Sequence, residues 1–148
     1  METTGAASFN ACAVGGPGVK VRFEQVNSIA SSLITKEVCD RIVENYALNE
    51  PPLLSRAVGD GEVVEACRRF ANDHRFIVGP ACGAALAAVY EGLVKRVLEG
   101  DDVKEFDLPP KENFEGNDGN GDGPVVVIVC GGAEVTFDLL KEWSEKEW

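Results

Sequence analysis

The sequence PVVVIVCGG, residues Pro124–Gly132, places five consecutive β-branched residues directly before a cysteine and two glycines. A continuous Val and Ile run without polar alternation is typical of a strand covered on both faces, as in the centre of a parallel α/β sheet. Ligands of such sheets bind at the carboxyl ends of the strands. The run therefore predicts a buried strand that presents Cys130 at this edge, where Gly131 and Gly132 let a bound group approach the backbone.

The rest of the chain alternates between strand-like and helix-like patterns. Hydrophobic periodicity predicts short strands at 20–24, 53–58 and 76–78, and helices at 27–33, 35–47, 62–74 and 80–98. Pro80 suits the first turn of the longest helix, and small residues such as Gly83 permit close packing on a sheet. A terminal helix is indicated by Val135, Leu139, Leu140 and Trp143. We therefore expect an α/β fold.

Composition narrows the class of partners. The chain has 148 residues, enough for one domain, and a net charge of −11. Such a surface repels phosphate backbones and anionic lipids, so we expect neither nucleic acid nor membrane as a partner. No signal peptide or membrane-spanning run is visible. Five scattered cysteines and one histidine, His74, indicate mostly buried thiols in a reducing, cytoplasmic compartment rather than disulfides or zinc.

Residues 100–123 form one segment without strand or helix periodicity. Its acidic, Gly- and Asn-rich composition predicts a solvated loop inserted in the domain. Asp118, Asn120 and Asp122 match the first half of a calcium loop, but position twelve is Val129 instead of the required Glu. The segment is therefore interpreted as an inserted loop rather than as a calcium site.

Three motifs resemble those of the L-serine and L-threonine dehydratases, pyridoxal-phosphate enzymes of the tryptophan-synthase β-like fold. Met1–Ala11 is similar to the Glu-Thr-x-Gly-Ala-x-Ser-x-x-Ala segment of that family, and Val78–Tyr90 and Val127–Gly132 are similar to its C-terminal part. The resemblance covers nearly the whole chain apart from residues 100–123. It implies that residues 1–148 are the C-terminal portion of a three-layer parallel-sheet catalytic domain whose N-terminal part is absent.

The resemblance also implies an activity. The family catalyses β-elimination from a small amino-acid substrate, L-serine and in some members L-threonine, which gives a 2-oxo acid and ammonia for amino-acid metabolism and gluconeogenesis. Pyridoxal phosphate accepts the electrons released when the substrate loses its α-proton. Cys130 would hydrogen-bond the pyridine nitrogen beside Gly131 and Gly132, and a thiol with a pKa of about 8.5 is too weakly basic to keep that nitrogen protonated. Periodicity alone would favour a buried core cysteine at position 130, and it is the resemblance that favours the cofactor role.

A second site and an assembly follow from the same resemblance. Glu2, the Ala6 carbonyl and Ser8 match a site for a monovalent or divalent cation, since hard cations prefer oxygen ligands. The alternative is that Glu2 is simply a frayed, exposed residue. The family further implies a homodimer.

Two motifs of the family are missing from the sequence. Neither the Schiff-base lysine in a Ser-x-Lys-x-Arg-Gly context nor a Gly-Gly-Gly-Gly-Leu phosphate loop occurs in these 148 residues. We therefore expect no catalytic lysine and no covalent cofactor binding by this chain alone. The chain would be a fragment, the product of a truncated gene model or a degenerate copy. Two hypotheses remain: part of an amino-acid lyase, or a catalytically silent module that pairs with a dehydratase subunit.

Overall fold

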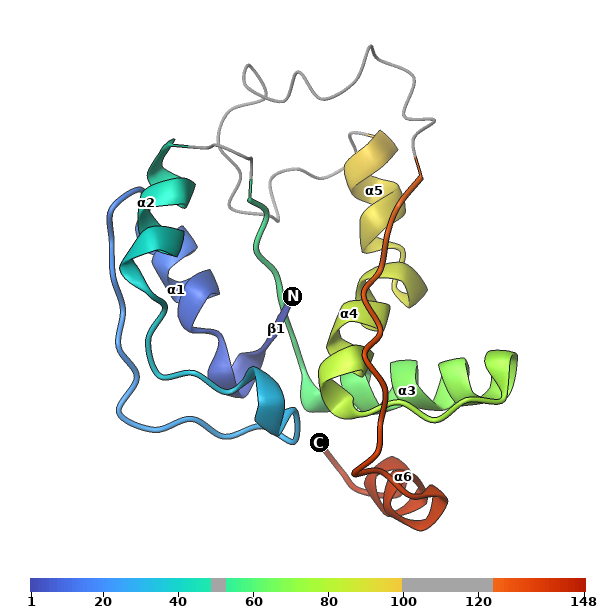
Figure 1. Cartoon of the computed structure of the whole chain (residues 1–148). Coiled ribbons are helices and arrows are strands. Elements are labelled where there is room, and N and C mark those ends of the chain that lie inside the picture. The colour runs from blue at the N-terminus through green and yellow to red at the C-terminus, as the bar shows by residue number, and fades with distance from the viewer. Residues whose placement is uncertain (49–52, 100–123) are drawn as a thin grey trace.

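A computed structural model of the chain describes residues 1–48, 53–99 and 124–148 (Figure 1). Strand β1 (Glu2–Thr3) pairs in parallel with β2 (Ala57–Val58), with Glu2 opposite Ala57. This small parallel sheet among helices confirms the α/β class. The helices are α1 (Ser8–Gly15), α2 (Asp40–Leu48), α3 (Asp60–His74), α4 (Pro80–Tyr90), α5 (Leu93–Glu99) and α6 (Phe137–Ser144), with 3-10 turns η1 (Thr4–Ala6) and η2 (Ser31–Leu33).

The core lies between α3 and α4, and α6 packs against α3. Gly83 sets the separation of the two main helices, because a Cβ there would lie 2.5 Å from the Cys67 Sγ and 2.6 Å from the Val63 carbonyl oxygen. The small residues of α4 therefore do permit close packing, as predicted. They pack against a helix, however, and not against a sheet.

The longest predicted helix is divided into α4 and α5. Gly92 has a φ of +70° and follows the last turn of α4, where its N–H donates to the Val89 carbonyl at 3.0 Å. A glycine in this left-handed conformation ends an α-helix. The prediction of one continuous helix over 80–98 was therefore wrong at Glu91 and Gly92, and the two flanking segments are helical.

Two predicted strands are not strands in the structure. Residues 20–24 contribute only an isolated antiparallel bridge between Arg22 and Glu37, and residues 76–78 are extended without pairing. The helix predicted over 35–47 begins at Asp40, because the Thr35 hydroxyl closes a local turn by donating to the Glu37 carbonyl at 2.7 Å. Such side-chain bonds to the backbone compete with helix formation.

The start of α3 is anchored by two carboxylates. Gly59 precedes the helix, and its N–H donates to the Glu62 carboxylate at 2.6 Å. Asp60 lies in the first turn of this helix. It accepts hydrogen bonds from the Ser28 hydroxyl at 2.7 Å and from the Ile29 N–H at 3.0 Å. Asp60 thereby ties the loop before η2 to α3.

Residues 124–132 form an extended segment, and the prediction that this stretch is a buried strand was wrong. It runs alongside α4 and α5 (Figure 1), but within the described residues no strand pairs with Val125–Val129. Val127 and Val129 pack on the core, whereas Val126 is 81% exposed and Ile128 is 73% exposed. A strand is buried on both faces only when a sheet and a second layer cover it. The residues that the structure describes cover only one side of this segment.

The predicted loop over 100–123, with its calcium alternative, lies outside the described residues. None of the helices in the described ranges combines the length and hydropathy needed to cross a bilayer.

Candidate functional site

The Gly131–Gly132 turn is joined to the start of α4. The Gly131 carbonyl accepts a hydrogen bond from the Gly79 N–H at 2.9 Å. A Cβ on Gly132 would lie 2.7 Å from backbone atoms of Val78 and Gly79, and Gly131 has a φ of +130°. Glycine is therefore needed at both positions, at Gly132 because the backbones approach closely and at Gly131 because φ is positive. At Gly132, the group that approaches closely is the backbone of Val78 and Gly79, whereas the sequence predicted a bound group there.

Three thiols lie around this junction. The Cys82 Sγ accepts a hydrogen bond from the Cys130 N–H at 3.2 Å and donates to the Gly131 carbonyl at 3.4 Å. The Cys67 Sγ donates to the Gly79 carbonyl at 3.6 Å, and burial raises the pKa of this thiol to about 12. Cys67 and Cys82 are buried, whereas Cys130 is exposed. Cys130 is therefore the thiol of this group that a ligand can reach, and the buried-core alternative for it is wrong.

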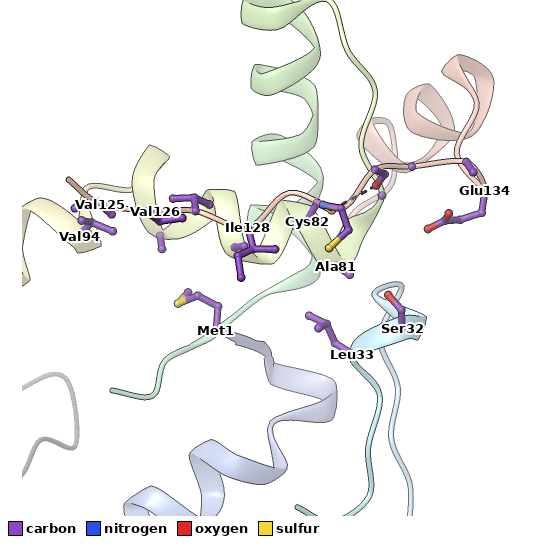
Figure 2. Close-up of a pocket in the computed structure, with 18 residues that line it drawn as sticks. Met1, Ser32, Leu33, Ala81, Cys82, Val94, Val125, Val126, Ile128 and Glu134 are labelled. Atoms are coloured by element: carbon purple, nitrogen blue, oxygen red, sulfur yellow. Dashed lines mark hydrogen bonds between the residues drawn. The ribbon is translucent and has the colours of Figure 1, made fainter. Parts of the chain in front are cut away.

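A cavity of about 890 Å³ lies beside the turn, with mostly apolar walls (Figure 2). One wall is the extended segment with the first turns of α4, and Met1 and Leu33 lie opposite (Figure 2). The lining residues are Met1, Ser32, Leu33, Gly79, Ala81, Cys82, Ala85, Ala88, Val94, Val125, Val126, Val127, Ile128, Cys130, Gly131, Gly132, Ala133 and Glu134. The volume falls within the range of about 300–1,000 Å³ that is usual for small-molecule sites.

The structure brings the three predicted cofactor residues together on this cavity. Cys130, Gly131 and Gly132 all line it. Sequence reasoning gave no role to two further residues, Cys82 and Glu134. Glu134 carries the only charged side chain among the described lining residues, and its Oε1 would lie 2.6 Å from a Cβ placed on Gly79. The carboxylate thus occupies space that Gly79 leaves free at the start of α4.

The predicted cation ligands lie around the start of α1. The Glu2 carboxylate accepts hydrogen bonds from the Phe9 N–H at 3.0 Å and the Asn10 N–H at 2.6 Å. A carboxylate at this position stabilises a helix N-terminus. Glu2 is therefore a fixed, half-buried residue, and the frayed alternative is wrong. Among the described residues, no group of three or more His, Cys, Asp or Glu side chains is arranged to hold a metal ion.

Two hydroxyl groups near Glu2 have no hydrogen-bond partner in the part of the chain that the structure describes. Ser8 and Thr3 are fully buried, and neither hydroxyl oxygen forms a hydrogen bond within the described residues. Buried polar groups are nearly always hydrogen-bonded in folded proteins. The Ser8 hydroxyl is therefore available to a small polar ligand, a water molecule or an ion.

Comparison with known proteins gives homologues over nearly the whole chain. No protein-family model matches it. A "Serine dehydratase-like" protein of Rattus norvegicus is 41% identical over 142 residues, which are 96% of this chain and 37% of the relative. The "L-serine dehydratase/L-threonine deaminase" of Homo sapiens is 34% identical over 147 residues, which are 99% of this chain and 39% of the relative.

A solved structure gives the same result. The L-serine ammonia-lyase of the fungus Rhizomucor miehei superposes with a TM-score of 0.75 at 32% identity, over 98% of this chain and 39% of the fungal chain. The predicted resemblance to serine dehydratases is thus confirmed. The chain spans about 37% of the length of the curated relatives it matches, at their C-terminal part.

Proposed function

We propose that this chain is part of a pyridoxal-phosphate-dependent lyase. The enzyme would eliminate water from L-serine, and from L-threonine as a second substrate, to give a 2-oxo acid and ammonia. The observation that carries this proposal is the Cys130-Gly131-Gly132 turn on the wall of the cavity, in a chain similar to serine dehydratases over 96% of its length. The homodimer and the cytoplasmic location that the resemblance implies belong to the same proposal.

The cavity residues fit the ring end of such a cofactor. A Cβ on Gly131 would meet no atom within 4 Å, so this glycine borders open space on a mostly apolar wall. Bound pyridoxal phosphate supplies an electron sink for the substrate carbanion. The exposed Cys130 thiol would face the ring nitrogen and, as a weak base, would leave it unprotonated. No lysine or arginine is among the described lining residues. The lining residues therefore account for the ring end of the cofactor and not for its phosphate or its aldehyde.

The cation site belongs to the same proposal. The Glu2 carboxylate, the Ala6 carbonyl and the Ser8 hydroxyl would hold a monovalent or divalent cation at the start of α1. The unpartnered, fully buried Ser8 hydroxyl supports this assignment, because oxygen ligands suit hard cations. The ion would brace β1 and α1, and β1 directly follows Met1, which lines the cavity.

The second candidate function is a catalytically silent module that pairs with a dehydratase subunit. The sequence analysis left this alternative open, because the 148 residues contain neither the family's lysine motif nor its phosphate loop. In that case the same fold would be retained for association, and the cavity would have no catalytic role.

A chimaeric enzyme separates the two candidates. In it, the 148-residue chain replaces the matched part of the fungal L-serine ammonia-lyase, which is 39% of that chain. We expect the purified chimaera to release 2-oxo acid and ammonia from L-serine in equal amounts. A folded chimaera that binds pyridoxal phosphate but shows no such release would favour the silent module.

A further inference from the structure

We propose that Cys82 and Cys130 form a reversible disulfide when a peroxide oxidises the chain, and that this bond removes the thiol that would face the cofactor ring. Formation of the bond depends only on the fold of this chain. Its effect on the cofactor rests on the proposed function, and the two are tested by separate measurements.

The two thiols meet where the Gly131–Gly132 turn joins α4. Cys130 is the last residue before the turn, and Cys82 lies in the first turn of α4, on the cavity wall (Figure 2). The Cys130 N–H donates to the Cys82 Sγ at 3.2 Å, so this sulfur lies at most about 4.7 Å from the Cys130 Cα, given an N–Cα bond of about 1.46 Å. A disulfide joins cysteines whose Cα atoms are about 4.4–6.8 Å apart. The Cys82 sulfur is therefore within reach of position 130 for such a bond.

The two thiols differ in exposure in the way that a redox-sensing pair requires. Cys130 is exposed on the cavity, whereas Cys82 is only 5% exposed. Oxidants act on accessible thiols, and redox-sensing cysteines often lie next to a second cysteine that resolves the oxidised form. Cys130 is therefore the thiol that is oxidised first, and Cys82 is the resolving thiol.

The backbone beside Cys130 accommodates the bond. Gly131 has a φ of +130°, and a Cβ at this position would meet no atom within 4 Å. A glycine next to open space allows Cys130 to turn toward α4 with only local changes in dihedral angle. At most, the movement gives up the two hydrogen bonds of the Cys82 Sγ, with the Cys130 N–H and the Gly131 carbonyl. Thiols are weak hydrogen-bonding groups, so this loss is small.

The other three cysteines are not placed to compete. The Cys67 Sγ donates to the Gly79 carbonyl at 3.6 Å, and burial raises the pKa of this thiol to about 12, so it stays protonated and is a poor nucleophile. Cys12 is buried, and its Sγ accepts a hydrogen bond from the Val21 N–H at 3.2 Å. Cys39 is exposed but does not line the cavity, which makes it a matched control for Cys130.

The reaction balances with hydrogen peroxide as the oxidant. The Cys130 sulfur attacks one peroxide oxygen, the O–O bond breaks, and a sulfenic acid and one water are formed. The Cys82 sulfur then attacks the Cys130 sulfur, the S–S bond forms, and the sulfenic hydroxyl leaves as a second water with the proton of the Cys82 thiol. The two sulfurs together lose the two electrons that reduce the peroxide. A thiol reductant reverses the bond by exchange, so in a reducing compartment the bond is transient, as redox-sensing disulfides are.

The bond changes the cavity at the position proposed for the cofactor ring. A disulfide sulfur has no S–H to donate, and the Cys130 Sγ is drawn toward α4. Loss of one hydrogen bond of this kind weakens binding by about fivefold. Because coupling between two binding events is reciprocal, pyridoxal phosphate over Cys130 should in turn oppose formation of the disulfide.

Mass spectrometry of the full 148-residue chain tests the bond. The reduced chain is treated with hydrogen peroxide, the remaining thiols are alkylated, and the chain is digested with trypsin, which places each cysteine in a separate peptide. We expect the peptides 76–95 and 112–141 to be joined, within one copy of the chain, by a disulfide that dithiothreitol removes. A different pairing, a link between two copies, or oxidation of Cys130 without a link would overturn the proposal.

Three single variants test the pairing. Cys130→Ser changes an exposed side chain, so the fold should be kept, and its disulfide content after peroxide should be less than about one-tenth of that of the parent chain. The control Cys39→Ser should form as much disulfide as the parent. In Cys82→Ser, Cys130 should go on to sulfinic acid, because no resolving thiol is present. Since Cys82 is buried, this variant is checked by circular dichroism, and Cys130→Ser decides the outcome if it does not fold. Equal disulfide contents in Cys130→Ser and Cys39→Ser would contradict the pairing.

The effect on the cofactor is measured in the chimaera described above. We expect the Kd for pyridoxal phosphate to rise by about fivefold after oxidation, to return with dithiothreitol, and to be unchanged by peroxide in a chimaera that carries Cys82→Ser. A disulfide that forms without a change in Kd would overturn the role given to it at the cofactor ring. A chimaera that binds no pyridoxal phosphate in either state would count against both this role and the proposed function, whereas the disulfide itself is decided by mass spectrometry.

Discussion

The substitution Gly83→Ala tests how closely α3 and α4 pack. In an open helix this change would stabilise the protein by about 1 kcal/mol, because alanine has the higher helix propensity. In α4 the added Cβ would lie 2.6 Å from the Val63 carbonyl oxygen and 2.5 Å from the Cys67 Sγ. An ordinary contact begins near 3.4 Å, so the helices would have to separate by about 0.8 Å along a buried interface.

The steric term should exceed the propensity term. Overpacking of a core costs about 1–3 kcal/mol, and we take the upper end because a backbone oxygen cannot rotate away. Subtracting the gain of about 1 kcal/mol in propensity leaves a net loss of about 2 kcal/mol. With an m-value of about 2 kcal/mol per M, the urea midpoint should fall by about 1 M.

Urea unfolding followed by circular dichroism measures this loss, with Ala85→Gly on α4 as a control. That control should cost about 1 kcal/mol through propensity alone. Adding Cys67→Ala to Gly83→Ala removes one of the two contacts, so the double variant should lose less than the sum of the single losses. An increase in the urea midpoint for Gly83→Ala would refute the close packing of α3 on α4.

Three further predictions concern carboxylates and a thiol. Asp60→Ala should lower the free energy of unfolding by about 1–3 kcal/mol, because it removes the acceptor for the Ser28 hydroxyl and the Ile29 N–H. The control Asp138→Ala, in the first turn of α6, should cost less than about 1 kcal/mol. Equal losses in urea unfolding would contradict the role given to Asp60. Potassium or magnesium should raise the Tm of the wild-type chain but not that of Glu2→Gln, and an equal rise in both would exclude Glu2 as a cation ligand. Burial raises the pKa of the Cys67 thiol to about 12, so the unfolded chain loses the thiol proton at a lower pH than the folded chain does. The free energy of unfolding should therefore fall as pH rises from about 9, and this thiol contributes at most about 1.4 kcal/mol per pH unit. Cys67→Ala should flatten that decline in unfolding free energy, and an unchanged slope would show that other groups cause it.

The sequence predicted the helices better than the strands, for a physical reason. Helix α3 has its own hydrophobic stripe, with Val63 and Cys67 on one face, and Pro80 marks the start of α4. Strand pairing depends instead on residues far apart in the chain. No local pattern indicates that Glu2–Thr3 pairs with Ala57–Val58. Strand β1 was not predicted, and β2 covers only the last two residues of the strand predicted over 53–58.

The extended segment shows the same limit for burial. Its Val and Ile run correctly predicted an extended backbone, but the burial of both faces requires neighbours that the described residues do not provide. The side chains that composition places in a core are here divided between core and solvent. Composition therefore indicates the environment for which a segment is suited, and not the one that a given chain supplies.

The candidate site was partly predictable. The Cys130-Gly131-Gly132 turn was found from its motif, and the structure places all three residues on one cavity. Cys82 and Glu134 were missed because their roles depend on tertiary contacts, namely the bond between the Cys130 N–H and the Cys82 Sγ and the space over Gly79. Neither contact has a signature in the local sequence.

The activity of Cys130 variants shows whether the Cys130-Gly131-Gly132 turn contacts the cofactor ring. In the chimaera with the fungal enzyme, Cys130→Ala and Cys39→Ala are compared, since both remove an exposed thiol and only Cys130 lines the cavity. A hydrogen bond to the cofactor ring worth about 1 kcal/mol corresponds to a loss of about fivefold in kcat/KM for L-serine. We predict this loss for Cys130→Ala and an unchanged value for Cys39→Ala. Equal values for both variants and the unmodified chimaera would contradict the assignment of the Cys130-Gly131-Gly132 turn to the cofactor.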